Sequence, residues 1–268
     1  MGRPVSPHPG FDPAESLGPS GSFEVFSGER ETLQVLLIQV RDREKALIHE
    51  RLCFLERLGI DPSRLDSVNI VDGPVPRPSE TLRFDLVILG GAGTHAAYQD
   101  YPFTAPLLEL VLELVERRRP FFGSCFGHQF LARALGGTVE LDLEREEVGT
   151  FDITLSPDGV GDDLFRGYPG SFPVHLGHHD RVTELPEGLL SLADSDLCPH
   201  QVIRVPGSPV YGTQFHCEMS RDHMRERLLM YADEYLRGDD PLSALDRTIR
   251  PTRLVDGLLS RFVETYLG

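Results

Sequence analysis

The sequence predicts an α/β fold, in which helices cover both faces of a mostly parallel, doubly wound sheet of the flavodoxin-like kind. Short apolar runs of strand length alternate with amphipathic helical patterns through the first half of the chain, and glycine-rich turns follow two of those runs. Strands buried on both faces are typically near-continuous apolar runs, and the helices that connect them cover the sheet. After Gly137 the pattern changes, which predicts an antiparallel β excursion.

Each predicted element follows from its local pattern. Apolar, β-branched runs predict parallel strands, and apolar positions three or four residues apart predict helices. The expected strands of the first half are residues 33–40, 67–71, 84–89 and 120–122, and the expected helices are residues 43–58 and 105–118. Alternating polarity predicts an antiparallel strand at 148–155, with short strands at 189–193, 201–205 and 210–215. Two further helices are expected at 224–235 and 254–267.

The 268 residues, 40% of them hydrophobic, suit one large or two small domains with a substantial core. Residues 1–31 are rich in Pro, Gly and Ser without periodicity, which predicts a flexible or strap-like tail. We expect residues 32–237 to form the main domain. Residues 238–268 are expected to form a helical extension packed on it.

Charge and composition exclude several classes of partner. A formal charge of −16 without a basic run disfavours nucleic acid and anionic membrane surfaces. No apolar run approaches the roughly 20 residues that a membrane-spanning helix needs, and the N-terminus lacks the apolar region of a secretory signal. The four cysteines have no C-x-x-C spacing, so we expect reduced thiols and a cytoplasmic protein.

Cys125 lies on a predicted sharp turn between an apolar strand and a helix. Gly123 and Gly127 flank it at two residues on either side, which permits a strained backbone in the manner of the nucleophile elbow of hydrolases. A helix N-terminus beneath the sulfur would favour the reactive thiolate. An isolated cysteine after a strand is more often a small buried hydrophobe, so the interpretation of Cys125 depends on its partners.

A cysteine nucleophile needs a base and a group that orients the base. His216 and Glu218 stand two residues apart where a predicted strand ends, so both side chains can point the same way. Thioester chemistry also needs two N–H donors for an oxyanion. We expect one from Phe126, directly after the cysteine, and one from Gly91 in the glycine-rich turn that follows residues 84–89.

Several motifs resemble those of one family. The run around Cys125 is similar to the G-x-C-x-G-x-Q hallmark of class I glutamine amidotransferases, and residues 211–218 resemble the G-x-Q-F-H-P-E of that family. Residues 85–91 resemble its D-x-x-x-x-G-G loop and residues 147–149 its E-x-G segment. Residues 178–186 resemble a stretch of the amidotransferase domain of GMP synthetase. In order and spacing the resemblance covers about residues 33–237, and it implies that residues 32–237 are an amidotransferase domain.

The resemblance implies hydrolysis of a γ-glutamyl amide. Cys125 would attack the side-chain carbonyl of glutamine, His216 would pass the proton to the departing ammonia, and water would resolve the thioester. Substrate contacts are implied for Gln129, His178, His179 and Asp180. No metal or organic cofactor is implied.

The chain departs from the family pattern at three positions. Cys217 and Ala92 stand where the family commonly has proline, and neither change removes a catalytic group. His179 replaces a glycine, which suggests a narrower pocket or an added donor for a substrate larger than glutamine.

Three functions stay open. The first is an amidotransferase that supplies ammonia to a separate acceptor synthetase, since no nucleotide-binding loop of the G-x-x-x-x-G-K type is present. The second is a γ-glutamyl peptidase that acts on glutathione-like conjugates. The third is a non-catalytic or chaperone-like protein with a displayed thiol, and the presence of both His216 and Glu218 counts against it.

Overall fold

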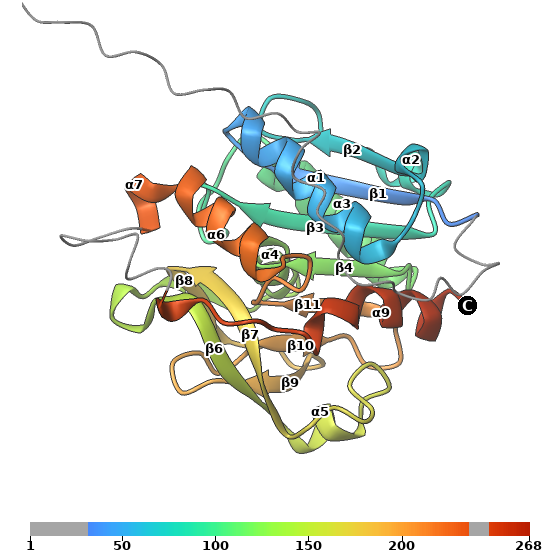
Figure 1. Cartoon of the computed structure of the whole chain (residues 1–268). Coiled ribbons are helices and arrows are strands. Elements are labelled where there is room, and N and C mark those ends of the chain that lie inside the picture. The colour runs from blue at the N-terminus through green and yellow to red at the C-terminus, as the bar shows by residue number, and fades with distance from the viewer. Residues whose placement is uncertain (1–31, 236–246) are drawn as a thin grey trace, which may run out of the picture.

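A nine-stranded sheet forms the centre of the computed structural model, which describes residues 32–235 and 247–268 (Figure 1). The strands are β1 (Val35–Val40), β2 (Leu65–Asn69), β3 (Leu86–Ala92), β4 (Phe121–Ser124), β5 (Thr138–Leu141), β6 (Glu147–Leu155), β7 (Ser171–His178), β8 (Asp180–Glu184), β9 (Leu190–Asp194), β10 (Val202–Arg204) and β11 (Val210–Thr213). The helices are α1 (Glu44–Leu58), α2 (Pro78–Thr81), α3 (Thr104–Glu116), α4 (Phe126–Ala134), α5 (Pro157–Gly161), α6 (Arg221–Met230), α7 (Ala232–Tyr235) and α9 (Leu258–Tyr266). The expected tail at 1–31 lies outside the described residues.

Five adjacent strands, in the order β2-β1-β3-β4-β11, run parallel to one another. This order is that of the flavodoxin-like doubly wound sheet, and it confirms the predicted fold. Side chains of β1 alternate between the two faces, because successive residues of a strand point to opposite sides. Val35 and Leu37 belong to the core on one face of the sheet, while Leu36 and Ile38 belong to the core on the other.

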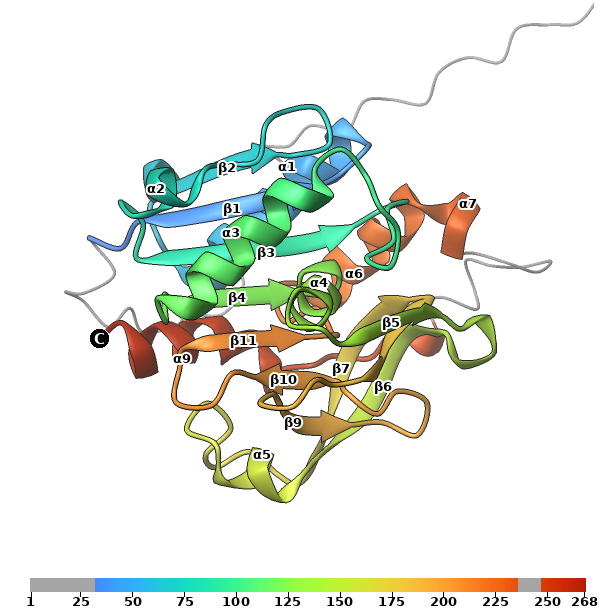
Figure 2. The same cartoon turned by 180° about the vertical axis from the view of Figure 1, so that it is seen from behind.

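Helices cover both faces of this parallel part. On one face lie α1, α6 and α9, and α1 contacts both of the others (Figure 1). On the other face lie α3 and α4, and α4 packs on β3, β4 and β11 (Figure 2). The helices thus bury the near-continuous apolar strands, and α4 sits directly over the strands whose ends carry the candidate site.

The second half of the sheet is antiparallel, as the change of pattern after Gly137 predicts. Strand β10 pairs antiparallel with β11 and β9, and β6 pairs antiparallel with β9 and β7. A separate two-stranded sheet joins β5 to β8. The sequence did not predict β5, β7 or β8, since β7 contains a proline and two histidines and lacks a clean alternation of polarity.

Two other boundaries differ from expectation. Gly90 and Gly91 continue β3 instead of forming a turn after it. The helix expected over 224–235 ends at Met230, and a short second helix follows Tyr231. No helix of the described residues is both long and apolar enough to cross a membrane.

The C-terminal helix α9 is part of the main core. Phe262 is fully buried and meets Phe122 of β4 and Tyr211 of β11 edge to face, with ring centroids 5.5 and 5.8 Å apart. Val255, just before α9, is also fully buried. The helix therefore packs beneath β4 and β11, the two strands that lead to the candidate site.

Truncation of the Phe262 side chain should destabilise the whole protein. We expect Phe262→Ala to lower the free energy of unfolding by about 3–5 kcal/mol, because it removes a fully buried aromatic ring. Urea denaturation followed by circular dichroism measures this change. The matched control is Leu254→Ala, whose side chain is 48% exposed, with an expected change within about 0.5 kcal/mol. Equal effects of the two variants would show that α9 does not stabilise the core.

Candidate active site

Three neighbouring strand ends bring the predicted site residues together. Strand β4 ends at Ser124, immediately before Cys125, and its neighbour β11 ends at Thr213, three residues before His216. On the other side of β4, β3 ends at Ala92, directly after Gly91. Because the strands are parallel, their carboxyl ends meet at one edge, where doubly wound folds bind ligands.

Cys125 occupies the strained turn that the sequence predicts. Its φ of 51° and ψ of −98° are unusual for a residue with a side chain, and its N–H donates to the carbonyl of Thr213 at 2.8 Å. A Cβ atom on Gly123 would lie 2.5 Å from the carbonyl carbon of Gly127, and one on Gly127 would lie 2.1 Å from the carbonyl oxygen of Leu89. Both glycines are therefore needed for α4 to approach the sheet and hold the sulfur at this edge.

His216 joins the thiol to a buried carboxylate. Its Nδ1 lies 2.7 Å from Oε1 of Glu218, and the ring also forms a hydrogen bond with the sulfur of Cys125. Oε2 of Glu218 accepts a second hydrogen bond, at 3.0 Å, from the hydroxyl of Ser124. Glu218 is completely buried and His216 is 5% exposed. The imidazole thus has one orientation, set by the carboxylate on one side and facing sulfur on the other.

The charges of this buried pair support each other. Burial alone would lower the pKa of His216, but the charge of Glu218 and the hydrogen bond with Cys125 raise it to about 9. Burial would raise the pKa of Glu218, and the charge and hydrogen bond of His216 lower it to about 2. At neutral pH the pair is therefore an imidazolium and a carboxylate, and a positive charge next to sulfur favours thiolate.

Gln214 also contacts the sulfur, although no role was predicted for it from the sequence. Its Nε2 donates to Sγ of Cys125 at 3.7 Å. Gln129 holds Gln214 in place, because its own Nε2 donates to Oε1 of Gln214 at 3.1 Å and to the carbonyl of Asp180 at 2.7 Å. The signal that could have identified Gln214 was its position two residues before His216, in the segment already singled out.

The residues predicted to contact the substrate differ in their burial and in their hydrogen bonds. Both ring nitrogens of His178 are already bound, Nδ1 to the carbonyl of Asp180 and Nε2 to Glu147, each at 2.9 Å. The ring of His179 stacks on Tyr235 with centroids 5.0 Å apart. The Asp180 side chain is partly exposed, and burial raises its pKa to about 6 against the opposing charge of His178. His178 therefore braces the loop, while the side chains of His179 and Asp180 are partly exposed.

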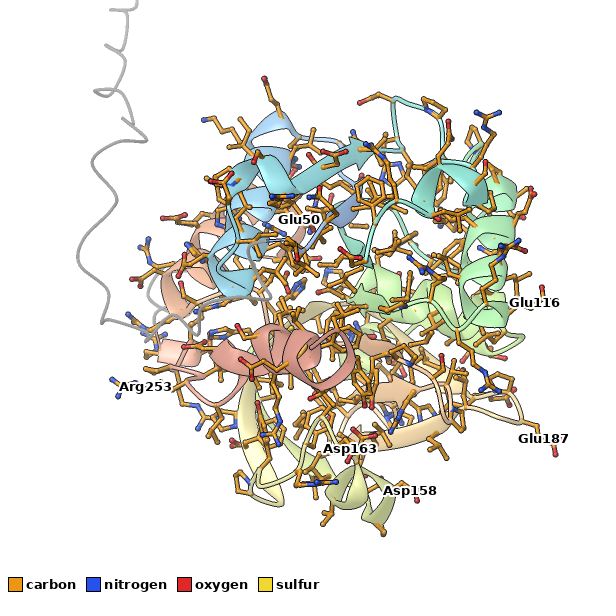
Figure 3. The ribbon with its side chains drawn as sticks, turned by 90° about the vertical axis from the view of Figure 1, so that its right-hand side faces the viewer. Glu50, Glu116, Asp158, Asp163, Glu187 and Arg253 are labelled. Carbon is orange, nitrogen blue, oxygen red and sulfur yellow. The ribbon has the colours of Figure 1, made fainter. Side chains whose placement is uncertain are left out.

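The two expected oxyanion donors differ in their partners. Phe126 begins α4, so its N–H is among those that have no acceptor within the helix. The N–H of Gly91 instead donates to Oε1 of Glu50 at 3.1 Å. Glu50 is fully buried on α1 and also accepts from Arg41 at 2.6 Å and from Gln39 at 3.0 Å. In Figure 3, Glu50 lies within the outline of the molecule, whereas Glu187 projects from its rim.

This ionic group behind β3, formed by Glu50, Arg41 and Gln39, was not predicted from the sequence. The signal was present in α1, whose buried positions Ala46, Glu50, Cys53 and Phe54 follow the helical period, so that a glutamate falls on the apolar face. Arg41 directly follows the last buried residue of β1. Among the described residues, no group of three or more His, Cys, Asp and Glu side chains is arranged to hold a metal ion.

The charge of Glu218 should control the protonation of His216. We expect Glu218→Gln to lower the pKa of His216 from about 9 toward its ordinary value of about 6.5, because the charge of Glu218 is lost while burial still opposes the imidazolium and only the contact with Cys125 favours it. Titration of the His216 ring by NMR measures this. In the wild type, the stabilisation from the raised pKa is complete below about pH 6.5 and is lost as pH rises through about 9.

Ser124→Ala is the matched control, since it removes a neutral hydrogen bond to Glu218 and leaves the charge. The His216 pKa should then stay well above 6.5. A pKa that is equally high in Glu218→Gln would mean that the carboxylate does not hold the imidazolium.

Comparisons with known proteins point to one family. The family model "Glutamine amidotransferase class-I" matches residues 67–232. "Gamma-glutamyl peptidase 3" of Arabidopsis thaliana is 27% identical over 179 residues, which cover 65% of this chain and 70% of that protein. "GMP synthase [glutamine-hydrolyzing]" of Thermosipho africanus is 34% identical over 143 residues, which cover 53% of this chain but only 26% of that protein.

Solved structures of similar proteins share the fold. The crystal structure of a glutamine amidotransferase from Thermotoga maritima superposes with a TM-score of 0.68 at 24% identity, covering 88% of this chain and 99% of that one. At this identity the likeness concerns the fold alone. Since the family model spans more than half of the 268 residues, the chain belongs to the class I glutamine amidotransferase family and is an enzyme.

Proposed function

We propose that the protein hydrolyses γ-glutamyl amides through a thioester on Cys125, with His216 as base and Glu218 as the group that orients it. The observation that carries this proposal is the buried chain of contacts from Glu218 through His216 to the sulfur, on a strained turn at the carboxyl edge of the sheet. These are the parts that a cysteine nucleophile requires.

In the proposed reaction, His216 holds the proton taken from the thiol as an imidazolium, and sulfur attacks the γ-carbonyl carbon. A C–S bond forms and the carbonyl electrons move to oxygen, which gives a tetrahedral oxyanion. When the oxyanion collapses, the C–N bond breaks and His216 gives its proton to the leaving nitrogen. Water, deprotonated by His216, then attacks the thioester and releases glutamate and the thiol.

The oxyanion is assigned to the N–H groups of Phe126 and Gly91. For Gly91 to serve, its N–H must leave Glu50, to which it donates at 3.1 Å. Gly91 has little space for this change, because a Cβ atom there would lie 2.8 Å from Nη2 of Arg41 and 3.2 Å from Cε1 of His216.

For the glutamyl part of the substrate we propose Asp180 as the acceptor of the α-amino group. Its carboxyl group is partly exposed and mostly ionised at neutral pH, since its pKa is raised only to about 6. Gln129 and His178 hold the Asp180 backbone by hydrogen bonds of 2.7 and 2.9 Å, which supports a positioning role for both. His179, stacked on Tyr235, is the proposed edge of the opening.

Glutamine is the simplest substrate, and ammonia release to an acceptor synthetase is the first candidate role. A γ-glutamyl peptidase role is the second candidate. It is favoured by the match to γ-glutamyl peptidase 3, which spans 70% of that protein against 26% of the GMP synthase. The acceptor synthetase and a cytoplasmic location stay predictions. A non-catalytic role is the alternative that the next experiment would reveal.

Cys125→Ala should abolish hydrolysis of glutamine and of γ-glutamyl peptides, with a loss of about 10⁴-fold or more, because the attacking atom is gone. Glutamate release by the wild type and the variant measures this. A glutamine-analogue electrophile should add to Cys125 of the wild type, as read by intact mass. Cys198→Ala is the control, since burial raises the pKa of that thiol to about 12. An unlabelled Cys125 with no turnover would support the non-catalytic alternative.

Gly91→Ala should lower kcat/KM for glutamine by about 10²-fold or more, because the added methyl collides with Arg41 and His216 where the oxyanion is stabilised. The control is Gly161→Ala, at an exposed glycine of α5 where a Cβ meets nothing within 4 Å. Circular dichroism and steady-state kinetics on both variants test the prediction. Unchanged kinetics in Gly91→Ala would remove Gly91 from the site.

A further inference from the structure

A small pocket lies next to His216 on the side of α6. His216, Arg41, Arg227, Tyr231 and Tyr235 are among the residues that line it. Arg41 of this pocket lies close to the reacting groups. A Cβ atom added to Gly91 would be 2.8 Å from Nη2 of Arg41 and 3.2 Å from Cε1 of His216.

The two arginines of this pocket are buried beside the same carboxylate. Arg41 is 2% exposed and Arg227 is 4% exposed. An oxygen of Glu50 lies 2.6 Å from Nη2 of Arg41 and 4.0 Å from Nη1 of Arg227. The charge of Glu218 also acts on Arg227, but Glu218 is already paired with the imidazolium of His216. Three buried cations therefore share two carboxylates, and buried charges are normally paired.

Individual N–H groups of both arginines are also unused. Arg227 donates through Nε and Nη2 to Nδ1 of His49, at 3.2 and 2.9 Å. Burial and the charge of Arg227 lower the pKa of His49 to about 3, so this histidine is neutral and adds no negative charge. Nε of Arg41 and Nη1 of Arg227 have no hydrogen-bond partner within the described parts of the chain.

The other polar groups of the pocket are occupied. The hydroxyl of Tyr231 donates to Asp42 at 3.1 Å, and that of Tyr235 donates to the carbonyl of Gly177 at 3.3 Å. Met224 and Leu228 add apolar walls. The pocket thus combines an apolar lining with two N–H groups that lack partners, which favours an anion. Its free volume of about 10 Å³ limits that anion to a single small group such as a carboxylate.

We infer that Arg41 and Arg227 bind a carboxylate on the leaving group, so that the substrates are γ-glutamyl amides of amino acids or peptides. The inference rests on the hydrolysis proposed above, in which His216 hands its proton to the leaving nitrogen. Whatever is attached to that nitrogen must therefore lie beside His216, where the pocket is. Ammonia from glutamine would leave both guanidinium donors unpaired, whereas an amino acid places its carboxylate near them.

A matched pair of substrates isolates this contact. γ-Glutamylglycine and γ-glutamylglycinamide differ only in the carboxylate of the leaving group. We expect the wild type to hydrolyse the glycine compound with a kcat/KM at least about tenfold higher, because charged hydrogen bonds form with the arginines. Glutamate release measures both rates. Equal rates for the two compounds in the wild type would overturn the inference and leave the hydrolytic function intact.

Variants of Arg227 test the contact within one protein. Arg227→Met should bring the ratio of the two kcat/KM values close to one, and Arg227→Lys, which keeps a cation, should retain part of the preference. General damage to the fold lowers both rates together and leaves their ratio unchanged. Arg225→Met is the matched control, since Arg225 is on the same helix but is not among the pocket-lining residues, and its ratio should equal that of the wild type. A preference retained in Arg227→Met would overturn the assignment.

Binding measurements distinguish the proposed anion site from the proposed hydrolytic function. Titration calorimetry on Cys125→Ala compares the affinities for the same two compounds without turnover. Binding at least about tenfold tighter for γ-glutamylglycine supports the anion site even if the wild type hydrolyses neither compound, an outcome that would overturn the proposed function alone. Equal affinities, with hydrolysis intact, would overturn the anion site alone.

Discussion

The close approach of α4 to the sheet, at the turn through Cys125, is the constraint on which the rest of this site depends. The cysteine can adopt its positive φ only because Gly123 and Gly127 lack side chains where β4, β3 and α4 meet. The N–H of Cys125 donates to Thr213, the last residue of β11, and so ties the turn to the strand that leads to His216. One packing requirement therefore places the sulfur, the helix N-terminus and the imidazole within reach of each other.

Burial sets the protonation states in this arrangement. Since Glu218 is removed from water, its negative charge acts strongly on His216 and outweighs the cost of burying an imidazolium. The same principle operates behind β3, where Glu50 pairs with Arg41 and holds the amide of Gly91. Two buried carboxylates thus act on opposite sides of the reacting groups, one through the imidazole and one through the backbone.

Sequence periodicity was sufficient for the parallel half of the fold. Residues 33–40 and 84–89 are apolar on both faces, a property that belongs to each strand by itself, and they correspond to β1 and β3. Periodicity failed for β7, because this strand carries histidines whose burial depends on partners elsewhere in the chain. His178, for example, is buried with Nε2 bonded to Glu147 of β6 and Nδ1 bonded to the carbonyl of Asp180.

By itself, the sequence determined the displayed cysteine and the histidine–glutamate pair, because a glycine-flanked turn and a two-residue spacing at a strand end are local features. Only the tertiary structure decided what surrounds them. The contact of Glu50 with Gly91 joins residues 41 positions apart, and the pocket beside His216 needs Arg41 from the end of β1 and Arg227 from α6. The physical reason is that the stability and protonation of a buried charge depend on its neighbours in space, and a local sequence pattern does not identify those neighbours.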